Sequence, residues 1–172
     1  FKAARFPART DDQGRLLTLE HQDRTLWRKD YIQWAWRFLQ KSSVFEGRSV
    51  YQIEAAIASY YSNAATYEDT NWLQILRLYD VLVEYKPSPV VKMSRVVVLS
   101  KLEGAEVAIE AMEEIEKEID GNQSFEAMKA DLYAETQNWN KARYHVSMAI
   151  RQSLNQTERR FLEEKLLAWK DK

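Results

Sequence analysis

The chain has 172 residues, a formal net charge of −1 and no cysteine. This length holds one domain with a substantial core or a short stack of repeats, and it excludes two large domains. The balanced charge excludes a global field that draws the chain to nucleic acid. The lack of cysteine excludes disulfides, thiolate catalysis and Cys-based zinc sites. We therefore expect a cytoplasmic protein.

Little in the sequence interrupts helices, because it contains only 4 glycines and 3 prolines. No apolar stretch approaches the roughly 18 residues of a membrane span, and no signal peptide is recognisable. The chain opens on FKAAR, which reads like the end of a helix, so we expect a fragment of a longer protein. These features favour a single all-α domain over residues 1–172.

Residues 1–25 are predicted to form an irregular, extended N-terminal segment packed on the helices. Pro7 interrupts this segment, and Asp11-Asp12-Gln13-Gly14 is typical of a tight turn. From Leu26 the apolar period becomes that of an amphipathic helix over residues 26–42. Its apolar positions are Trp27, Tyr31, Trp34, Ala35, Phe38 and Leu39.

Two more predicted helices complete the N-terminal helices, which occupy residues 26–86. The first covers residues 50–65. The second runs to Tyr85, with Asp69 or Thr70 as its N-cap. Lys86-Pro87-Ser88-Pro89 ends it, because proline has no backbone donor and disfavours helix in the residue before it.

Residues 87–172 contain the clearest repeats and a capping helix. Val96-Val97-Val98 is compatible with a strand, but Val91, Val98 and Leu102 keep a helical spacing, which favours helix. Helices are predicted at residues 90–103, 105–119, 125–136, 140–154 and 158–170. Ser124 is the expected N-cap of the third, and Thr157 or Asn155 that of the last.

The dipeptide Asn-Trp occurs at residues 71–72 and again at residues 138–139. The second copy fits the tetratricopeptide pattern, whose small and aromatic positions are taken by Ala130, Tyr133, Trp139, Ala142 and Ala149. Ala105 lies 34 residues before Trp139, and Trp72 lies 33 residues before Ala105. The sequence thus predicts antiparallel helix pairs stacked as a tetratricopeptide-like right-handed superhelix, with both indoles largely buried. An irregular helical bundle is the alternative.

No group of residues matches a catalytic or metal-binding motif. His21 and His145 lie outside HExxH or ExxH arrangements, and we interpret them as surface or partly packed residues. The run from Glu103 to Asp120 has a net charge of −7 but lacks matching ligands on other helices, which indicates a solvated face. We therefore expect no catalytic residue, cofactor, metal or small-molecule substrate, and no enzyme.

Basic and aromatic residues alternate near the N-terminus. Residues 2–41 have a net charge of +4, and Trp27, Trp34 and Trp36 fall among the basic positions. Two interpretations remain open: the aromatic residues form core, or they belong to a surface for nucleic acid or an acidic partner.

Three long stretches of the sequence form a specific combination: GRLLTLEHQDRTLW, YQIEAAIASYY and TNWLQILRLYDVLVEYKPSPVVKMSRVVV. Together they resemble the C-terminal extension of a group of bacterial extracytoplasmic-function RNA polymerase sigma factors. The similarity runs from about Ala4 to Leu166. The chain departs from that family at Tyr61, Ser94 and Gln137, where the family has His, Asn and Gly.

This resemblance implies a tetratricopeptide-like fold and a non-enzymatic regulatory role in transcription initiation. The implied partners are RNA polymerase or the sigma regions of its own full-length chain, without direct contact to nucleic acid or membrane. Arg24, Gln52, Tyr79 and Arg95 are the candidate partner-binding residues, and helix packing is the alternative role of each. A free-standing tetratricopeptide-type adaptor that binds a peptide or protein is the second hypothesis.

Overall fold

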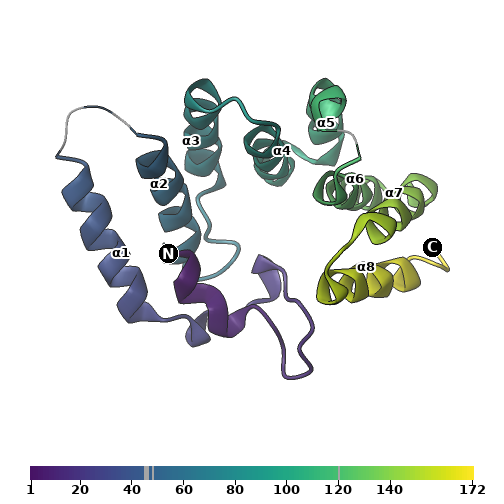
Figure 1. Cartoon of the computed structure of the whole chain (residues 1–172), viewed down its shortest axis with the longest axis horizontal. Coiled ribbons are helices and arrows are strands. Elements are labelled where there is room, and N and C mark those ends of the chain that lie inside the picture. The colour runs from purple at the N-terminus through teal and green to yellow at the C-terminus, as the bar shows by residue number, and fades with distance from the viewer. Residues whose placement is uncertain (45–46, 48, 120) are drawn as a thin grey trace. The chain divides into compact units, whose positions relative to one another are not determined.

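The protein is all-α, with helices packed as sequential antiparallel pairs, as predicted (Figure 1). The computed structural model describes residues 1–44, 47, 49–119 and 121–172. These residues form no sheet, and a single antiparallel bridge joins Thr10 to Leu16. The chain divides into two compact units, which we call unit 1 (Phe1–Pro87) and unit 2 (Ser88–Lys172).

Unit 1 begins with three short 3₁₀ helices that precede its α-helices. The elements are η1 (Lys2–Ala8), η2 (Leu19–His21), η3 (Arg24–Leu26), α1 (Lys29–Ser42), α2 (Val50–Asn63) and α3 (Trp72–Tyr85). The predicted tight turn is present: the Asp11 carboxylate accepts from the Gln13 and Arg15 amides at 2.9 Å, and Gly14 has φ +74°. The segment around that turn is less extended than predicted, because the three 3₁₀ helices occupy much of it.

The described residues of unit 2 form five helices in sequence, and each predicted helix after Pro87 is confirmed. They are α4 (Pro89–Glu103), α5 (Ala105–Ile119), α6 (Gln123–Glu135), α7 (Trp139–Gln152) and α8 (Gln156–Ala168). Val96 and Val98 are buried within α4, which confirms helix over the three consecutive valines. Ser88 begins α4, since its hydroxyl accepts from the Val91 amide and Pro89 needs no donor partner at the first helical position.

Asparagine is the N-cap of several helices, in two cases near the residue predicted as the cap. The predicted caps Asp69 or Thr70 of α3 and Ser124 of α6 are wrong, because Asn71 and Asn122 hold those positions. Asn caps as well as Asp or Ser, so local sequence alone does not choose between adjacent candidates. The Asn155 cap of α8 is confirmed. The start of α1 is later than predicted, because η3 ends at Leu26 and Trp27 is extended, with ψ 136°.

The repeated Asn-Trp dipeptide is a shared helix start. Asn71 and Asn138 are the N-caps of α3 and α7, with φ/ψ of −76°/75° and −81°/70°. Each side-chain oxygen accepts from the backbone amide three residues on, at 3.1 and 3.3 Å. Ala105 is the first residue of α5, so the second helices of successive pairs begin 33 and 34 residues apart. The predicted period is therefore present in the fold.

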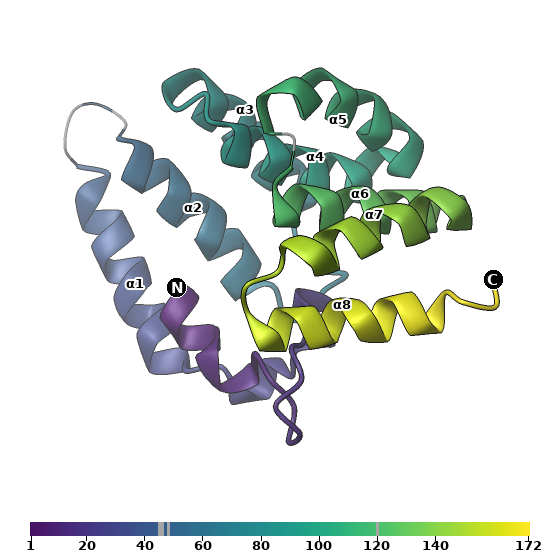
Figure 2. The same ribbon diagram turned by 45° about the vertical axis from the view of Figure 1, so that its right-hand side comes forward.

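Equivalent positions in these second helices face the core. Ile75, Ala108 and Ala142 each lie three residues after the helix start and are all fully buried. Small side chains at two of them let neighbouring helices approach closely. In both views α6 and α7 run alongside each other (Figure 2).

The two indoles at the helix starts are half-buried, so the prediction of largely buried indoles is only partly right. Trp72 lies edge-on to Tyr61 and Tyr67, at ring distances of 5.7 and 5.2 Å. Trp139 packs against Trp169 at 6.3 Å. The first position of a helix lies at the end of the pair, where only one side of a large ring meets the core.

Candidate protein-interaction surface

Helix α1 carries apolar side chains on two sides. One side holds the half-buried residues Ile32, Ala35, Trp36 and Leu39. The other holds Tyr31, Trp34 and Phe38, which are 47%, 64% and 65% exposed. Of the three tryptophans left open between core and surface, Trp27 is buried, Trp36 is half-buried and Trp34 is exposed. A helix packed on one side buries one apolar stripe, and Trp36, in edge contact with Phe1 at 6.3 Å, belongs to the buried one.

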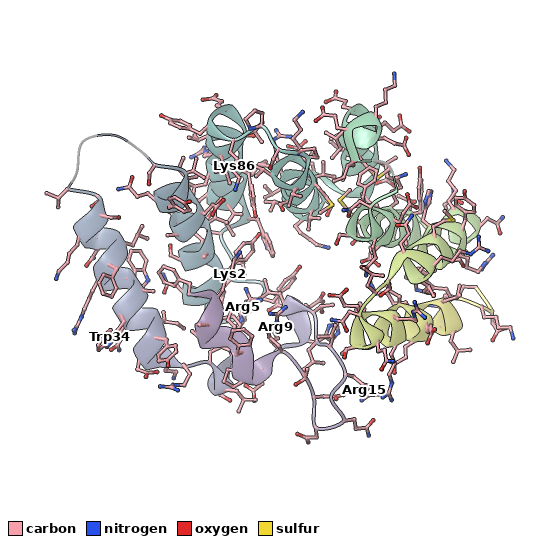
Figure 3. The ribbon with its side chains drawn as sticks, viewed as in Figure 1. Lys2, Arg5, Arg9, Arg15, Trp34 and Lys86 are labelled. Atoms are coloured by element: carbon pink, nitrogen blue, oxygen red, sulfur yellow. The ribbon has the colours of Figure 1, made fainter. Side chains whose placement is uncertain are left out.

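Two cationic side chains flank the exposed aromatic residues. Arg37 and Lys41 follow Trp34 and Phe38 by three residues each, a spacing that makes side chains neighbours on a helix. Both are exposed, and neither is paired with a carboxylate of the described residues. We call Tyr31, Trp34, Arg37, Phe38 and Lys41 the outer face of α1. In Figure 3 Trp34 points away from α2.

A second basic group lies on η1. Lys2 and Arg9 are exposed and Arg5 is half-buried, and Figure 3 shows the three along this helix. Burial lowers the pKa of Arg5, and the nearby charges of Arg9 and Arg24 lower it further. Because η1 packs against α1 through Phe1 and Trp36, these cations do not extend the outer face.

The predicted partner-binding residue Arg24 has contacts that hold the fold together. Its guanidinium donates to the backbone carbonyls of Tyr61 and Ala64, at 3.1 and 2.7 Å. These carbonyls belong to the end of α2, where a cation also complements the helix dipole. The same group lies 4.6 Å from the centre of the Trp27 ring. Arg24 therefore fastens η3 to the last turn of α2.

Gln52 likewise joins two helices of unit 1. Its side chain accepts from the Ser49 amide in a capping box and donates to the Ser42 carbonyl at 2.6 Å. The end of α1 is thereby fixed to the start of α2. Since Gln52 and Arg24 bond opposite ends of a 14-residue helix, about 20 Å apart, they do not form one site.

The other two predicted residues lie in different units. Tyr79 on α3 is half-buried beside Tyr61, and burial, followed by the proximity of Tyr79, raises the pKa of the Tyr61 phenol. Arg95 lies on α4 in unit 2.

The nominated residues Arg24 and Gln52 therefore hold unit 1 together rather than share a site. Of the exposed aromatic stripe, only Trp34 was a surface candidate in the sequence, and Tyr31 and Phe38 were missed. The signal for the stripe is that α1 has more apolar residues than one packed side can hold.

An open pocket of about 720 Å³ lies between α1, α2 and α3 of unit 1. Aliphatic and aromatic side chains dominate its lining. The lining residues are Leu39, Ser42, Ser43, Gly47, Gln52, Ile53, Ala56, Leu78, Val81 and Tyr85. A pocket of this character suits an apolar side chain of a peptide better than a charged ligand.

Unit 2 encloses an ionic cluster that the sequence did not reveal. The Glu126 carboxylate contacts Nδ1 of His145 at 2.7 Å and Nζ of Lys129 at 3.3 Å, and Lys129 also bonds Glu116. Burial lowers the pKa of Lys129, but hydrogen bonding to Glu116 and the charge of Glu126 outweigh it, so the pKa is raised. Tyr133 stacks on His145 with ring centres 5.4 Å apart. The cluster joins α5, α6 and α7.

Other site classes find no support in the described part of the chain. No group of three or more His, Cys, Asp or Glu side chains among these residues is placed to hold a metal ion. None of the described helices is both long enough and apolar enough to cross a membrane.

Comparison with known proteins places two similarities on this chain. Residues 1–43 match a family of unknown function, DUF6596. The chain is 32% identical over 163 residues to an uncharacterized protein of Rhizobium meliloti (strain 1021), covering 95% of this chain and 38% of that protein. The chain therefore spans less than half the length of this relative. No solved structure matches the present chain. The segment shared with DUF6596 contains η1 to η3 and all of α1.

Proposed function

We propose that this chain is a non-enzymatic regulatory domain of a bacterial extracytoplasmic-function sigma factor. It modulates transcription initiation through contacts with the sigma regions of its full-length chain or with RNA polymerase. The observation that carries the interaction role is the outer face of α1, where three large aromatic side chains are exposed together. Exposed aromatic groups of this kind mark protein-binding surfaces.

The sigma-factor assignment is supported by the combined sequence motifs described above. The structure gives these motifs a role in shaping unit 1: Arg24 bonds the end of α2, and Gln52 joins α1 to α2. The greater length of the Rhizobium relative fits a domain that works within a larger protein. In this proposal the motifs hold the fold, and α1 contacts the partner.

Transcription in a purified system tests this function. The full-length protein that contains this chain, RNA polymerase and the target promoter are compared with a version lacking residues 1–172. We expect deletion to change transcript yield and Trp34→Ala to reproduce part of that change. Tyr144→Ala, which removes a 61% exposed aromatic ring from α7, is the matched control and should leave yield unchanged. Equal yield and equal polymerase affinity with and without the domain would exclude the proposal.

The pocket in unit 1 favours a second function, a free-standing tetratricopeptide-type adaptor that binds a peptide. This function predicts that peptide binding depends on pocket residues and needs no sigma regions. Ile53→Ser and Leu78→Ser, which make the pocket polar, should then abolish binding while Trp34→Ala leaves it intact. Loss of binding with Trp34→Ala alone would favour the first function.

A further inference from the structure

We propose that the outer face of α1 binds an acidic amphipathic helix of a partner protein. The apolar stripe of that helix covers Tyr31, Trp34 and Phe38, and its carboxylates pair with Arg37 and Lys41. This inference rests on the proposed function, because it names the chemistry of the partner that the regulatory domain contacts.

The spacing of the aromatic residues selects a helical partner. Positions 31, 34 and 38 fall within one side of α1 and span about 10 Å along its axis. Apolar residues at i, i+3 and i+7 form the kind of stripe that a second helix packs against. Trp36 lies on the opposite side and contacts Phe1, so α1 is held from behind while the stripe remains exposed.

The charges beside this stripe select acidic residues on the partner. Asp30, the only carboxylate of α1, is bound by the Arg28 guanidinium through contacts of 2.9 and 2.6 Å. Arg37 and Lys41 have no such partner among the described carboxylates. Two unbalanced cations beside three aromatic rings match a helix with glutamates flanking its apolar residues.

The same features fit a nucleic acid less well. Binding to a phosphate backbone draws on many cations that follow the strand. The outer face has two, and although residues 2–41 have a net charge of +4, unit 1 as a whole carries twelve basic against eleven acidic residues. The basic residues of η1 lie with the packed side of α1 and add nothing to the exposed stripe.

The test uses the 172-residue chain and a fluorescein-labelled 18-residue peptide with Leu at helical i, i+3, i+4 and i+7 positions and Glu elsewhere. Fluorescence anisotropy gives its affinity. A second peptide has the same composition in scrambled order. A third, the Lys peptide, has Lys in place of every Glu. We expect the scrambled peptide to bind at least tenfold more weakly and the Lys peptide not to bind. Trp34→Ala should weaken binding of the Glu peptide at least tenfold.

A charge-reversed variant separates pairing from general stickiness. The double variant Arg37→Glu with Lys41→Glu should no longer bind the Glu peptide and should bind the Lys peptide instead. Tyr144→Ala and the double variant Lys2→Glu with Arg9→Glu are matched controls that should bind as the unmodified chain does. Circular dichroism and thermal unfolding establish that each variant is folded. Retained binding by folded Trp34→Ala would overturn the proposal.

The proposal is also overturned if the outer face of α1 prefers one of two other binding partners. One such outcome is tighter binding of fluorescein-labelled dT20 than of the Glu peptide, with the same sensitivity to Trp34→Ala. The other is self-association in sedimentation that Trp34→Ala abolishes. If the Glu peptide fails to bind but domain deletion still changes transcription, this inference fails and the proposed function stands. If the peptide binds at α1 and transcription is unaffected by deletion, the proposed function fails instead.

Discussion

Among the described residues, unit 2 fully buries more of its apolar side chains than unit 1 does, whereas unit 1 exposes more large aromatic side chains than unit 2. In unit 2, Phe125 and Met112 are almost fully buried, and alanines lie where helices pack closely. In unit 1, α1 has no fully buried residue. Among described residues, unit 1 also holds most of the buried polar atoms that lack a hydrogen-bond partner: Arg24 Nη2, Trp27 Nε1, Ser62 Oγ and Thr70 Oγ1.

In our proposal, one architecture therefore serves two purposes in the chain. The repeats of unit 2 are held by close packing and by an enclosed ionic cluster. Helix α1 is held on one side only, and its aromatic residues on the other side contribute nothing to the core. Substitutions therefore separate the two: changes in unit 2 should alter stability, and changes on the outer face of α1 should alter binding.

The largest expected effect compares two aromatic residues, one from each unit. Phe125→Ala removes a ring that is 0% exposed and should lower the free energy of unfolding by about 3–5 kcal/mol. Trp34→Ala removes a ring that is 64% exposed and should change it by less than about 0.5 kcal/mol. Urea denaturation followed by circular dichroism measures both. A comparable loss for Trp34→Ala would show that the outer face belongs to a core.

The next effect comes from the ionic cluster of unit 2. Lys129→Met leaves Glu126 buried with His145 alone and should cost roughly 3 kcal/mol, because a buried carboxylate loses the lysine that pairs with it. Lys165→Met is the matched control, since Lys165 pairs at 2.6 Å with Asp131, whose side chain is 46% exposed. Such a pair contributes at most about 1 kcal/mol. Equal losses in the two variants would contradict the burial argument.

The pH dependence of stability sharpens this comparison. The pKa of Lys129 is raised above its ordinary value of 10.5 in the folded state. The stabilisation is therefore fully present below pH 10.5 and is lost as the pH rises through the higher, folded-state value. The difference in unfolding free energy between the unmodified chain and Lys129→Met should shrink above pH 10.5. A difference that stays constant up to the pH of alkaline unfolding would exclude a charged Lys129 as its source.

Periodicity predicted the helices and the repeat, because these follow from local spacing and from proline breaks. The 33- and 34-residue register of Trp72, Ala105 and Trp139 needed no tertiary information. The choice of Asn71 over Thr70 as N-cap, in contrast, needed tertiary information, since both side chains suit that position.

The candidate surface was harder to predict for a different physical reason. An apolar residue on a helix looks the same in sequence whether it packs inward or stays exposed. Tyr31, Trp34 and Phe38 match a buried stripe, and it is the packing of α1 on α2 and η1, including Trp36 on Phe1, that turns the other side inward. The ionic cluster around Glu126 and Lys129 likewise draws on three helices, which spacing within one helix does not show.

The smallest expected effect concerns the turn between α6 and α7. Gln137 has φ +58° there, a backbone conformation in which a side chain costs roughly 1 kcal/mol or more. Replacing Gln137 by glycine removes this backbone strain, but the greater freedom of glycine in the unfolded chain offsets part of the stability gained. Gln137→Gly should therefore raise the free energy of unfolding by about 0.5–1 kcal/mol. The reverse change, Gly104→Ala at φ +93° between α4 and α5, should lower it by about 1 kcal/mol. If both variants destabilise, the contacts of the Gln137 side chain outweigh its backbone strain, and the α6–α7 turn differs in kind from the α4–α5 turn.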